Sequence, residues 1–518
     1  MPIIAQNKNL TLITICLGGV NYGQGDISAA LKLIGGIVIS NQHQQSIHVN
    51  VTWILCTRDL NDDLPFYESF VQKALNLGIE VVVSDLSGIK IDESALSQAD
   101  LLVYFPTISD IPIAIFTRVN KYKDKLLSIG EYNFDHHDKG VRIGLGEGRL
   151  GIFIEKNLAP PLPLILDQAS ASDKELLNQL ALIDISTQTV TAEKIASYKQ
   201  DHLLFFGYFA LNLNQAINTD AVNPIKFCEI ALHIAALKDV KNVDIIVRLG
   251  DDVVNLPNYF ATMCSSIEVI TSKRQFIIKN LNGNNNLPKA RIFDSFPVSN
   301  DVFKLLMTTV AEKYFMGLTG DQSLTEGICC NAVIFLQIMS WKRHLAKALN
   351  QICHQTLPLD AQLLRFSSYV IESQDAGIST HKIAKFLVTN ESQLLREMQH
   401  VQKAIEANFN LLENLVPRLL MALLAPSQVD KIFAGYQKES VLSFKPIIYS
   451  KINKYSVQAV STLGYLSKPS LSMQEQSAMM KNIKDLKQAL LFNKTNTNHT
   501  NIINILPKYD NIMYNYKY

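Results

Sequence analysis

Short apolar runs alternate with amphipathic stretches in two successive series, and this pattern constrains the fold more than any other feature of the chain. In the first series, the apolar runs lie at residues 10–17, 49–56, 80–84 and 101–105. The pattern restarts near residue 201, with apolar runs at 202–208, 244–249, 267–271, 291–293 and 333–336. Strands that alternate with helices form parallel sheets covered by helices on both faces. The sequence therefore predicts an α/β fold with two units of similar size.

The pattern divides the chain into five segments. We expect an N-terminal Rossmann-like domain at residues 1–155 and a second Rossmann-like domain at residues 201–345, joined by a connection or hinge at 156–200 that includes a proline-rich stretch. A helical region at 346–492 and a poorly ordered tail at 493–518 should follow. Ligands of such parallel sheets bind outside the carboxyl ends of the strands. Two facing domains would place both of these edges around one cleft.

Composition narrows the functional classes. The formal net charge is +1, which gives no overall field that would attract nucleic acid. Seven cysteines occur without a zinc-binding spacing, and their odd number argues against a disulfide framework, so a reducing compartment is expected. No secretory signal and no apolar run long enough to span a bilayer is present. We expect a cytoplasmic protein, and the alternative is export by a secretion system that needs no N-terminal signal.

A glycine turn late in the second unit is the first candidate site. Residues 317–327 have the sequence GLTGDQSLTEG, between a helical run and an apolar strand. A helix that begins at or near Asp321 or Ser323 would offer free backbone N–H groups and a positive dipole end to a phosphate. Ser323 could bind a phosphate oxygen, and Glu326, one turn later, could accept hydrogen bonds from sugar hydroxyls. The alternative is a capping box made by Ser323 and Glu326.

A second glycine turn follows the first predicted strand. Residues 17–27 have the sequence LGGVNYGQGDI, which is neither a dinucleotide fingerprint nor a P-loop. Gly23 and Gly25 allow the backbone to approach a ligand closely. Asp26 lies where the next helix should begin, at the mouth of the cleft. It is either a general base for an acceptor nucleophile or an N-cap.

The two turns together resemble those of GT-B glycosyltransferases, which have two Rossmann domains and hold a nucleotide sugar in the C-terminal domain. The motifs are most similar to those of the arginine rhamnosyltransferases of elongation factor P, with Asn-Phe-Gly-Asp-Ile and Gly-Glu-Asp-Ser. The matching segments here are residues 21–23 and 25–27, interrupted by Gln24, and residues 320–323. The chain is longer than members of that family, chiefly in its helical C-terminal part.

The resemblance implies roles for individual residues. Asp26 becomes the candidate base, and Asp321, Gln322 and Ser323 become candidate contacts of the donor phosphates, with Gly320 in the same turn. Glu326 is a further donor contact. Tyr208, at the start of the second domain, would line the nucleotide pocket. GT-B enzymes of this kind are usually metal-independent, so neither a metal nor a cofactor is expected besides the nucleotide-diphosphate sugar.

Other polar residues are candidates with competing structural explanations. His136, within the sequence DHHD at 135–138, either contacts the acceptor substrate or lies in a solvated loop, and a metal site there is disfavoured. Arg149, in a glycine-dense stretch at 144–151, offers charge to an acceptor or belongs to an ordinary turn. Lys342 would neutralise phosphate, whereas its neighbour Trp341 is expected in the core. The pair Asp251 and Asp252 is interpreted as part of a turn.

The leading hypothesis is a glycosyltransferase that moves a sugar from a nucleotide-diphosphate donor to an acceptor such as a protein side chain. The alternatives are a non-catalytic binding or scaffold protein with a GT-B body, and a nucleotide-sugar epimerase or hydrolase. The abundance of Asn, Lys and Ile suggests an AT-rich bacterial source and an exported effector as one possible setting. The sugar, the nucleotide base and the acceptor are not determined by the sequence.

Overall fold

The fold comes from a computed structural model that describes most residues between 6 and 433. The gaps within that span are residues 16–24, 43–46, 58–59, 87–90, 92, 108–112, 134–139, 168, 211–217, 219–220, 250–259, 261, 272–274, 280–285, 295–297 and 376–378. Several features that the sequence analysis singled out lie outside the described residues: most of the first glycine turn, including Gly23, then His136, the pair Asp251–Asp252, the expected helical region from residue 434 to 492 and the expected tail at 493–518. The described residues all belong to one compact unit, Met1–Gly435.

The first domain is built on a five-stranded parallel sheet with the strand order β3-β2-β1-β4-β5. Its strands are β1 (Gln6–Ile15), β2 (Ile47–Thr57), β3 (Glu80–Asp85), β4 (Leu101–Thr107) and β5 (Leu126–Gly130). Its helices are α1 (Gly25–Gln42), α2 (Leu60–Asn76), α3 (Glu93–Gln98) and α4 (Ile113–Val119), followed by a 3₁₀ turn at Asn120–Lys125. The strand order and the intervening helices are those of a Rossmann-like domain.

Burial on both faces explains why the central strand is apolar almost throughout. Residues 10–15 of β1 are all buried, including two threonines. The hydroxyl of Thr14 donates to the carbonyl of Phe105 at 2.9 Å and accepts from Nε1 of Trp53 at 3.1 Å, so that its polar group is satisfied inside the core. Parallel strands covered by helices on both sides show this continuous apolar character rather than alternation.

The second domain is built on a seven-stranded sheet with the strand order β12-β11-β13-β10-β9-β14-β15. The strands are β9 (His202–Gly207), β10 (Asn242–Val247), β11 (Ser266–Thr271), β12 (Gln275–Lys279), β13 (Lys289–Asp294), β14 (Met316–Leu318) and β15 (Ile334–Leu336). The edge strand β12 is antiparallel to its neighbour, and the other pairs are parallel. The helices of this domain are α7 (Pro224–Leu237), α9 (Asn300–Leu305) with a π-helical turn at Leu306–Val310, and α10 (Asp321–Cys329).

The expected connection at 156–200 contains structure of its own. A three-stranded sheet of β6 (Leu164–Ile165), β7 (Ile183–Asp184) and β8 (Thr189–Val190) lies there with α5 (Ala171–Gln179) and α6 (Ala192–Asp201). Buried side chains of this segment, such as Leu176 and Ile195, pack into the same apolar core as Phe206 of β9. Most of this segment is therefore part of the second domain's core.

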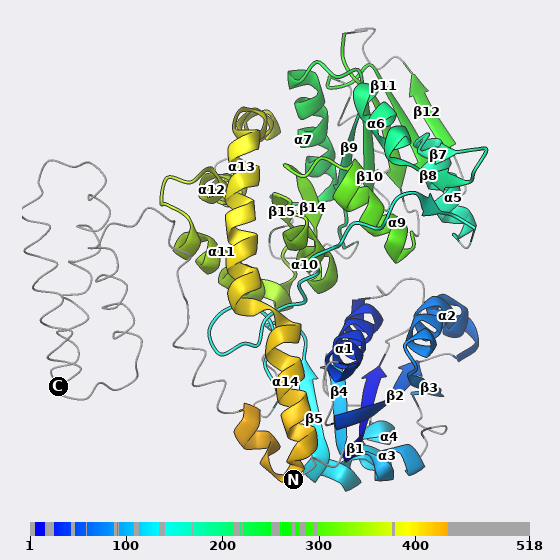
Figure 1. Cartoon of the computed structure of the whole chain (residues 1–518). Helices are drawn as coiled ribbons and strands as arrows, with labels where there is room; N and C mark the ends of the chain where they lie inside the picture. The colour runs from blue at the N-terminus through cyan, green and yellow to red at the C-terminus, as the bar shows by residue number, and fades with distance from the viewer. Residues whose placement is uncertain are drawn as a thin grey trace, which may run out of the picture. The chain divides into compact units, whose positions relative to one another are not determined.

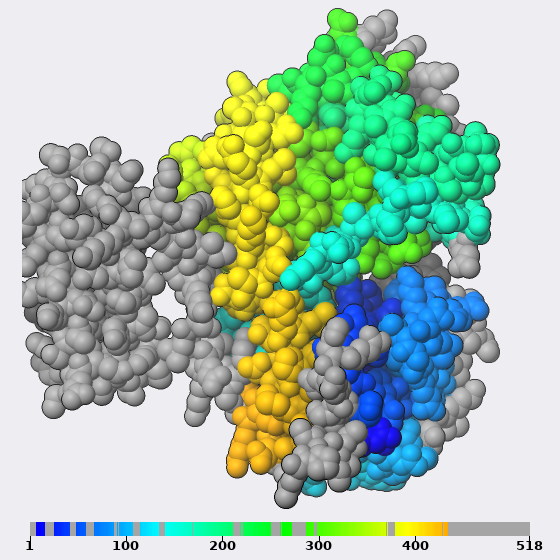
Figure 2. All heavy atoms as spheres, in the orientation of Figure 1, coloured from blue at the N-terminus to red at the C-terminus, as the bar shows by residue number. Residues whose placement is uncertain are grey.

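Within the described residues, four α-helices follow the second sheet: α11 (Arg343–Thr356), α12 (Gln362–Asp375), α13 (Thr380–Phe409) and α14 (Leu411–Leu424). The long helix α13 packs on α7 of the second domain, and α14 packs on α1 and β1 of the first (Figure 1). Figure 2 shows the same course in spheres, with α13 in yellow beside the second domain and α14 in orange beside the first. The backbone of Ile152 pairs with Asn410 at the junction of the two helices. The helical region thus returns the chain to the domain where it began.

The fold class is the expected one: α/β, with two Rossmann-like domains and an additional helical C-terminal region. Within the described residues, no helix combines the length and the apolar character that crossing a bilayer requires.

Candidate functional site

The late glycine turn forms as predicted, with one correction. Strand β14 ends at Leu318, and Gly320 adopts φ +77° as the N-cap of α10, a conformation that costs glycine little. The helix begins at Asp321, and no side chain caps it. The expected capping box is therefore wrong, because Ser323 lies inside the helix, where its hydroxyl donates to the carbonyl of Thr319.

The N-termini of α1 and α10 meet at the boundary between the two domains. A Cβ atom placed on Gly25 would lie 3.9 Å from Cβ of Gln322. Helix α1 begins at Gly25, so Asp26 lies in its first turn. Both helices follow strands of their sheets, β1 and β14, and each begins at the carboxyl edge of its sheet. The two motifs that the sequence placed about 300 residues apart are therefore neighbours.

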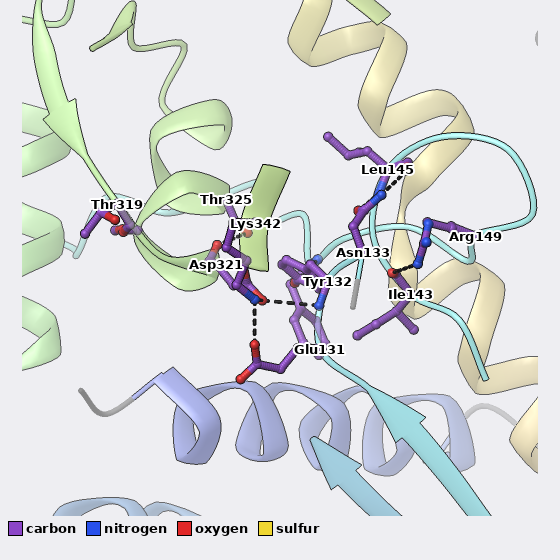
Figure 3. A network of polar contacts seen from close by, with 12 residues as sticks. Glu131, Tyr132, Asn133, Ile143, Leu145, Arg149, Thr319, Asp321, Thr325 and Lys342 are labelled. Carbon is purple, nitrogen blue, oxygen red and sulfur yellow. Dashed lines mark hydrogen bonds and ion pairs between the residues drawn. The ribbon is translucent and has the colours of Figure 1, made fainter. Parts of the chain in front are cut away.

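Three carboxyl groups and one ammonium group meet at this boundary, and we call Asp26, Glu131, Asp321 and Lys342 the acidic cluster. Nζ of Lys342 donates to Oε2 of Glu131 at 2.5 Å and to Oδ2 of Asp321 at 2.7 Å (Figure 3). Glu131 follows β5 of the first domain, whereas Asp321 and Lys342 belong to the second. Lys342, expected to neutralise phosphate, is 8% exposed and already pairs with two carboxylates.

Burial shifts the pKa values in this cluster, and the neighbouring charges add to that shift or oppose it. Burial, with smaller contributions from Glu131 and Asp321, raises the pKa of Asp26 from 3.8 to about 8, while Lys342 opposes the rise. Burial also raises the pKa of Asp321 to about 6, against the opposing effect of Lys342. Burial alone would lower the pKa of Lys342, but Asp321 and Glu131 hold it above its ordinary value. Asp26 can therefore exchange a proton near neutral pH, while Lys342 stays charged.

The segment that carries Glu131 is held by hydrogen bonds between side chains and backbone groups. The N–H of Tyr132 donates to Oδ2 of Asp321 at 3.2 Å, across the domain boundary. Asn133 makes a two-way bond with Leu145, donating to its carbonyl at 2.8 Å and accepting from its N–H at 2.9 Å (Figure 3). A Cβ atom on Gly144, which has φ +117°, would lie 2.0 Å from Oδ1 of Asn133. The glycine-dense stretch at 144–151 thus holds Asn133 in place, next to the segment that carries Glu131 of the acidic cluster.

A small recess opens beside Asp321 and Lys342. It has an empty volume of about 240 Å³ and is lined by the turn before α10, the segment after β15 and the start of α11. Two buried atoms of its lining residues, Oδ1 of Asp321 and Nε2 of Gln337, make no hydrogen bond within the described part of the chain.

A second polar group lies on the other side of α10, and we call Lys32, Glu155, Lys304 and Glu326 the lysine cluster. Nζ of Lys304 donates to Oε2 of Glu155 at 2.6 Å, and Lys32 forms an ion pair with the same carboxylate. Nζ of Lys32 lies 3.6 Å from Oε1 of Glu326, which accepts from Nε2 of Gln322 at 2.6 Å. Burial alone would raise the pKa of Glu155, but Lys32 and Lys304 hold it below its ordinary value.

Tyr208 lies near this second group. Its ring is 44% exposed and meets Phe303, the neighbour of Lys304, edge to face with centroids 6.0 Å apart. Burial raises the pKa of Tyr208; Arg248 opposes this shift and Glu326 adds to it, so both charges lie within electrostatic range. The exposed aromatic face, the lysines and Glu326 thus belong to one neighbourhood.

The structure brings together Gly25, Asp26, Asp321 and Lys342, and places Gln322, Glu326 and Tyr208 on the adjoining side of α10. Arg149 is only 8% exposed, and its Nη1 donates to the carbonyl of Ile143 at 3.3 Å, which directs it into the first domain. Trp341, expected in the core, is 39% exposed, so that expectation is wrong.

Sequence reasoning missed four residues of the two clusters. Glu131 directly follows β5, and a charged side chain at the carboxyl end of a parallel strand was a usable signal. Lys32 was visible too, since it and Asp26 are the only charged residues of the otherwise apolar α1. Glu155 and Lys304 gave no such signal, because their pairing depends on how the domains meet.

Comparisons with known proteins give no family assignment. No protein-family model matches the chain, and no curated protein sequence matches it significantly. A UDP-GlcNAc 2-epimerase from Neisseria meningitidis, solved with UDP-GlcNAc, matches with 11% identity and a TM-score of 0.34, over 79% of this chain and 100% of that chain. The N-terminal domain of a trehalose-6-phosphate phosphatase from Candida albicans matches with 12% identity and a TM-score of 0.40, over 82% and 100%. A spinosyn rhamnosyltransferase complexed with thymidine diphosphate matches with 9% identity and a TM-score of 0.26, over 77% and 99%.

Proposed function

We propose that this chain is a glycosyltransferase that moves a sugar from a nucleotide-diphosphate donor to an acceptor nucleophile, such as a protein side chain. The observation that carries the proposal is the meeting of Asp26 with the start of α10 across the domain boundary. A candidate base on one domain and a helix N-terminus on the other lie within reach of one small substrate. Transfer between a donor and an acceptor needs such an arrangement.

Asp26 has the properties of a general base. Its pKa, raised to about 8, makes the carboxylate a stronger proton acceptor than an ordinary aspartate, and a fraction stays ionised near neutral pH. In the reaction, ionised Asp26 takes the acceptor's proton while the acceptor atom bonds to the anomeric carbon. The bond from that carbon to the diphosphate oxygen breaks, and its electron pair leaves with the nucleoside diphosphate.

The start of α10 has the properties of a donor-phosphate contact. The first amides of a helix lack intrahelical acceptors, so the N–H groups of Gln322 and Ser323 are available to a leaving diphosphate. Negative charge develops on that group as the bond breaks, and preformed amide donors stabilise it.

A specific observation favours a second candidate on the same site, a nucleotide-sugar hydrolase or epimerase. Burial sets the pKa of Asp26 to about 8 and that of Asp321 to about 6, which separates an acid from a base within one cluster. Such a pair can move protons on a bound sugar without any acceptor.

The test is to incubate the purified protein with UDP-, GDP- and TDP-sugars and candidate acceptor proteins. Glycosyl transfer predicts a free nucleoside diphosphate together with a mass increase of one sugar on an acceptor. Release of free sugar without such an increase would assign hydrolysis, and an altered sugar still joined to the nucleotide would assign epimerisation. Calorimetry that detects no binding of any donor would leave only a scaffold role.

A further inference from the structure

The acidic cluster does not have the charge that a diphosphate needs. Its one cation, Lys342, is paired with Glu131 and Asp321, so a phosphate placed there would meet more carboxylate than ammonium. Backbone amides at the start of α10 supply hydrogen bonds but little net charge. If a nucleoside diphosphate binds in this boundary region, its charge must be balanced by other residues.

The lysine cluster offers that charge on the opposite side of the same helix. Lys32 comes from α1 of the first domain and Lys304 from α9 of the second, and both reach the carboxylate of Glu155. A carboxylate held between two ammonium groups occupies the place that a phosphate oxygen would take. The side chains are partly accessible, with 14% exposure for Lys32, 15% for Lys304 and 25% for Glu155.

We propose that Lys32 and Lys304 form the diphosphate subsite of the donor, and that Glu155 fills this subsite in the unliganded protein and must be displaced. The inference rests on the proposed function, since it takes the donor to be a nucleoside diphosphate. In the unliganded protein, Nζ of Lys32 pairs with Oε1 of Glu155 and lies 3.6 Å from Oε1 of Glu326, so displacement of Glu155 would free this ammonium group for an incoming oxygen.

Two neighbours connect this subsite with the rest of the proposed donor site. Gln322 donates to Glu326 beside Lys32, so the subsite adjoins the first turn of α10. Tyr208 packs on Phe303, next to Lys304, and offers its exposed ring to a nucleotide base. A diphosphate between the lysines would therefore adjoin the first turn of α10 and the side chain of Tyr208.

The competing explanation is a purely structural link between the domains. Lys32, Glu155 and Lys304 join elements of both domains, so removal of any one of them would weaken such a link. The two explanations predict opposite changes in nucleotide affinity when Glu155 is replaced. A placeholder competes with the ligand, so its removal strengthens binding; a structural link supports the site, so its removal weakens binding.

The experiment measures binding of UDP, GDP and TDP by calorimetry to the full chain and to Glu155→Gln, Lys32→Met and Lys304→Met. If Glu155 fills the subsite nine-tenths of the time, its replacement should tighten binding by about tenfold. Each lysine variant should weaken binding by at least about tenfold, through loss of a charge-assisted hydrogen bond. Glu413→Gln and Lys241→Met, at positions that are 65% and 55% exposed, are the matched controls.

The outcomes separate the inference from the function on which it rests. Tighter binding by Glu155→Gln supports the subsite and cannot arise from misfolding, which covers the case of unstable lysine variants. Weaker or unchanged binding by Glu155→Gln overturns the subsite, as do lysine variants that bind like wild type; transfer activity can stand in both cases. If neither wild type nor Glu155→Gln binds any of the three nucleotides, both proposals fail.

Discussion

The two clusters on either side of α10 use the same kinds of side chain in different proportions. The acidic cluster has Asp26, Glu131 and Asp321 around one lysine, whereas the lysine cluster has two lysines around Glu155, with Glu326 beside them. Both draw on the two domains. The pKa shifts follow from this difference: Asp26 is driven towards protonation, while Glu155 is held ionised.

The comparison teaches that burial and charge balance together can give neighbouring sites at a domain boundary separate tasks. In the acidic cluster, burial and the excess of carboxylates raise the pKa of Asp26, which suits proton transfer. In the lysine cluster, two ammonium groups reach one carboxylate, and displacement of that carboxylate would free both for an anion. We expect experiments that change one charge to affect the two clusters differently.

The largest expected effect is on catalysis in the acidic cluster. Asp26→Asn removes the proposed base while keeping nearly the same shape, so transfer should fall by about 10²–10⁴-fold. Nucleotide binding should persist, because the lysine cluster is unchanged. Mass spectrometry of the acceptor measures transfer, and calorimetry measures binding. Asp239→Asn is the matched control, at a side chain that is 87% exposed. Full transfer by Asp26→Asn would remove Asp26 from the mechanism.

The second largest expected effect is a difference between the clusters in how much the loss of one lysine lowers the free energy of unfolding. Lys342→Met leaves Glu131 and Asp321 without their only cation in the acidic cluster, and breaking a buried pair in this way costs about 3–5 kcal/mol. Lys32→Met should cost less, because Lys304 still pairs with Glu155. The exposed pair of Lys241 and Asp239 provides a control, Lys241→Met, with an expected cost of about 1 kcal/mol or less. Denaturant titration of the three variants gives the order, and equal costs would contradict the comparison.

The alternation of apolar runs was enough to predict most strands of both sheets, because core burial imposes a local pattern on them, but it did not predict β5. It was also enough to place the start of α10, since Gly320 before Asp321 is a local signal. The capping box failed for a local reason as well: the positive φ of Gly320 starts the helix early and turns Ser323 inwards.

The clusters themselves could not be predicted from spacing. Lys342 finds Glu131, which is 211 positions away, and Lys304 finds Glu155 across 149 positions. Such pairs depend on how two sheets approach each other, which no local pattern contains. A lone lysine on an apolar helix, such as Lys32, shows that a buried partner is needed but not which one.

A smaller effect concerns the support behind the acidic cluster. Alanine at Gly144 would bring Cβ to 2.0 Å from Oδ1 of Asn133, at a positive φ, so we expect a cost of about 3 kcal/mol. Gly148→Ala is the matched control, because its φ is +72° and no atom lies within 4 Å. Its cost should be about 1–2 kcal/mol, from the backbone alone. Transfer activity should fall only for Gly144→Ala, since Asn133 adjoins the segment that carries Glu131. Equal losses in both variants would show that the loop does not support the cluster.

The smallest effect over a single pH unit is the pH dependence of stability. Because burial raises the pKa of Asp26 from 3.8 to about 8, the folded protein binds a proton that the unfolded chain has already released. The resulting stabilisation is complete below pH 3.8 and is lost as the pH rises to about 8. Asp26→Asn lacks this loss, so wild type should lose stability relative to Asp26→Asn by roughly 1 kcal/mol for each pH unit across most of this range. Asp321 titrates in both wild type and Asp26→Asn, so its contribution largely cancels in the difference between their free energies of unfolding. Urea midpoints measured across this range test the prediction, and parallel curves would mean that Asp26 is ionised throughout and stores no proton.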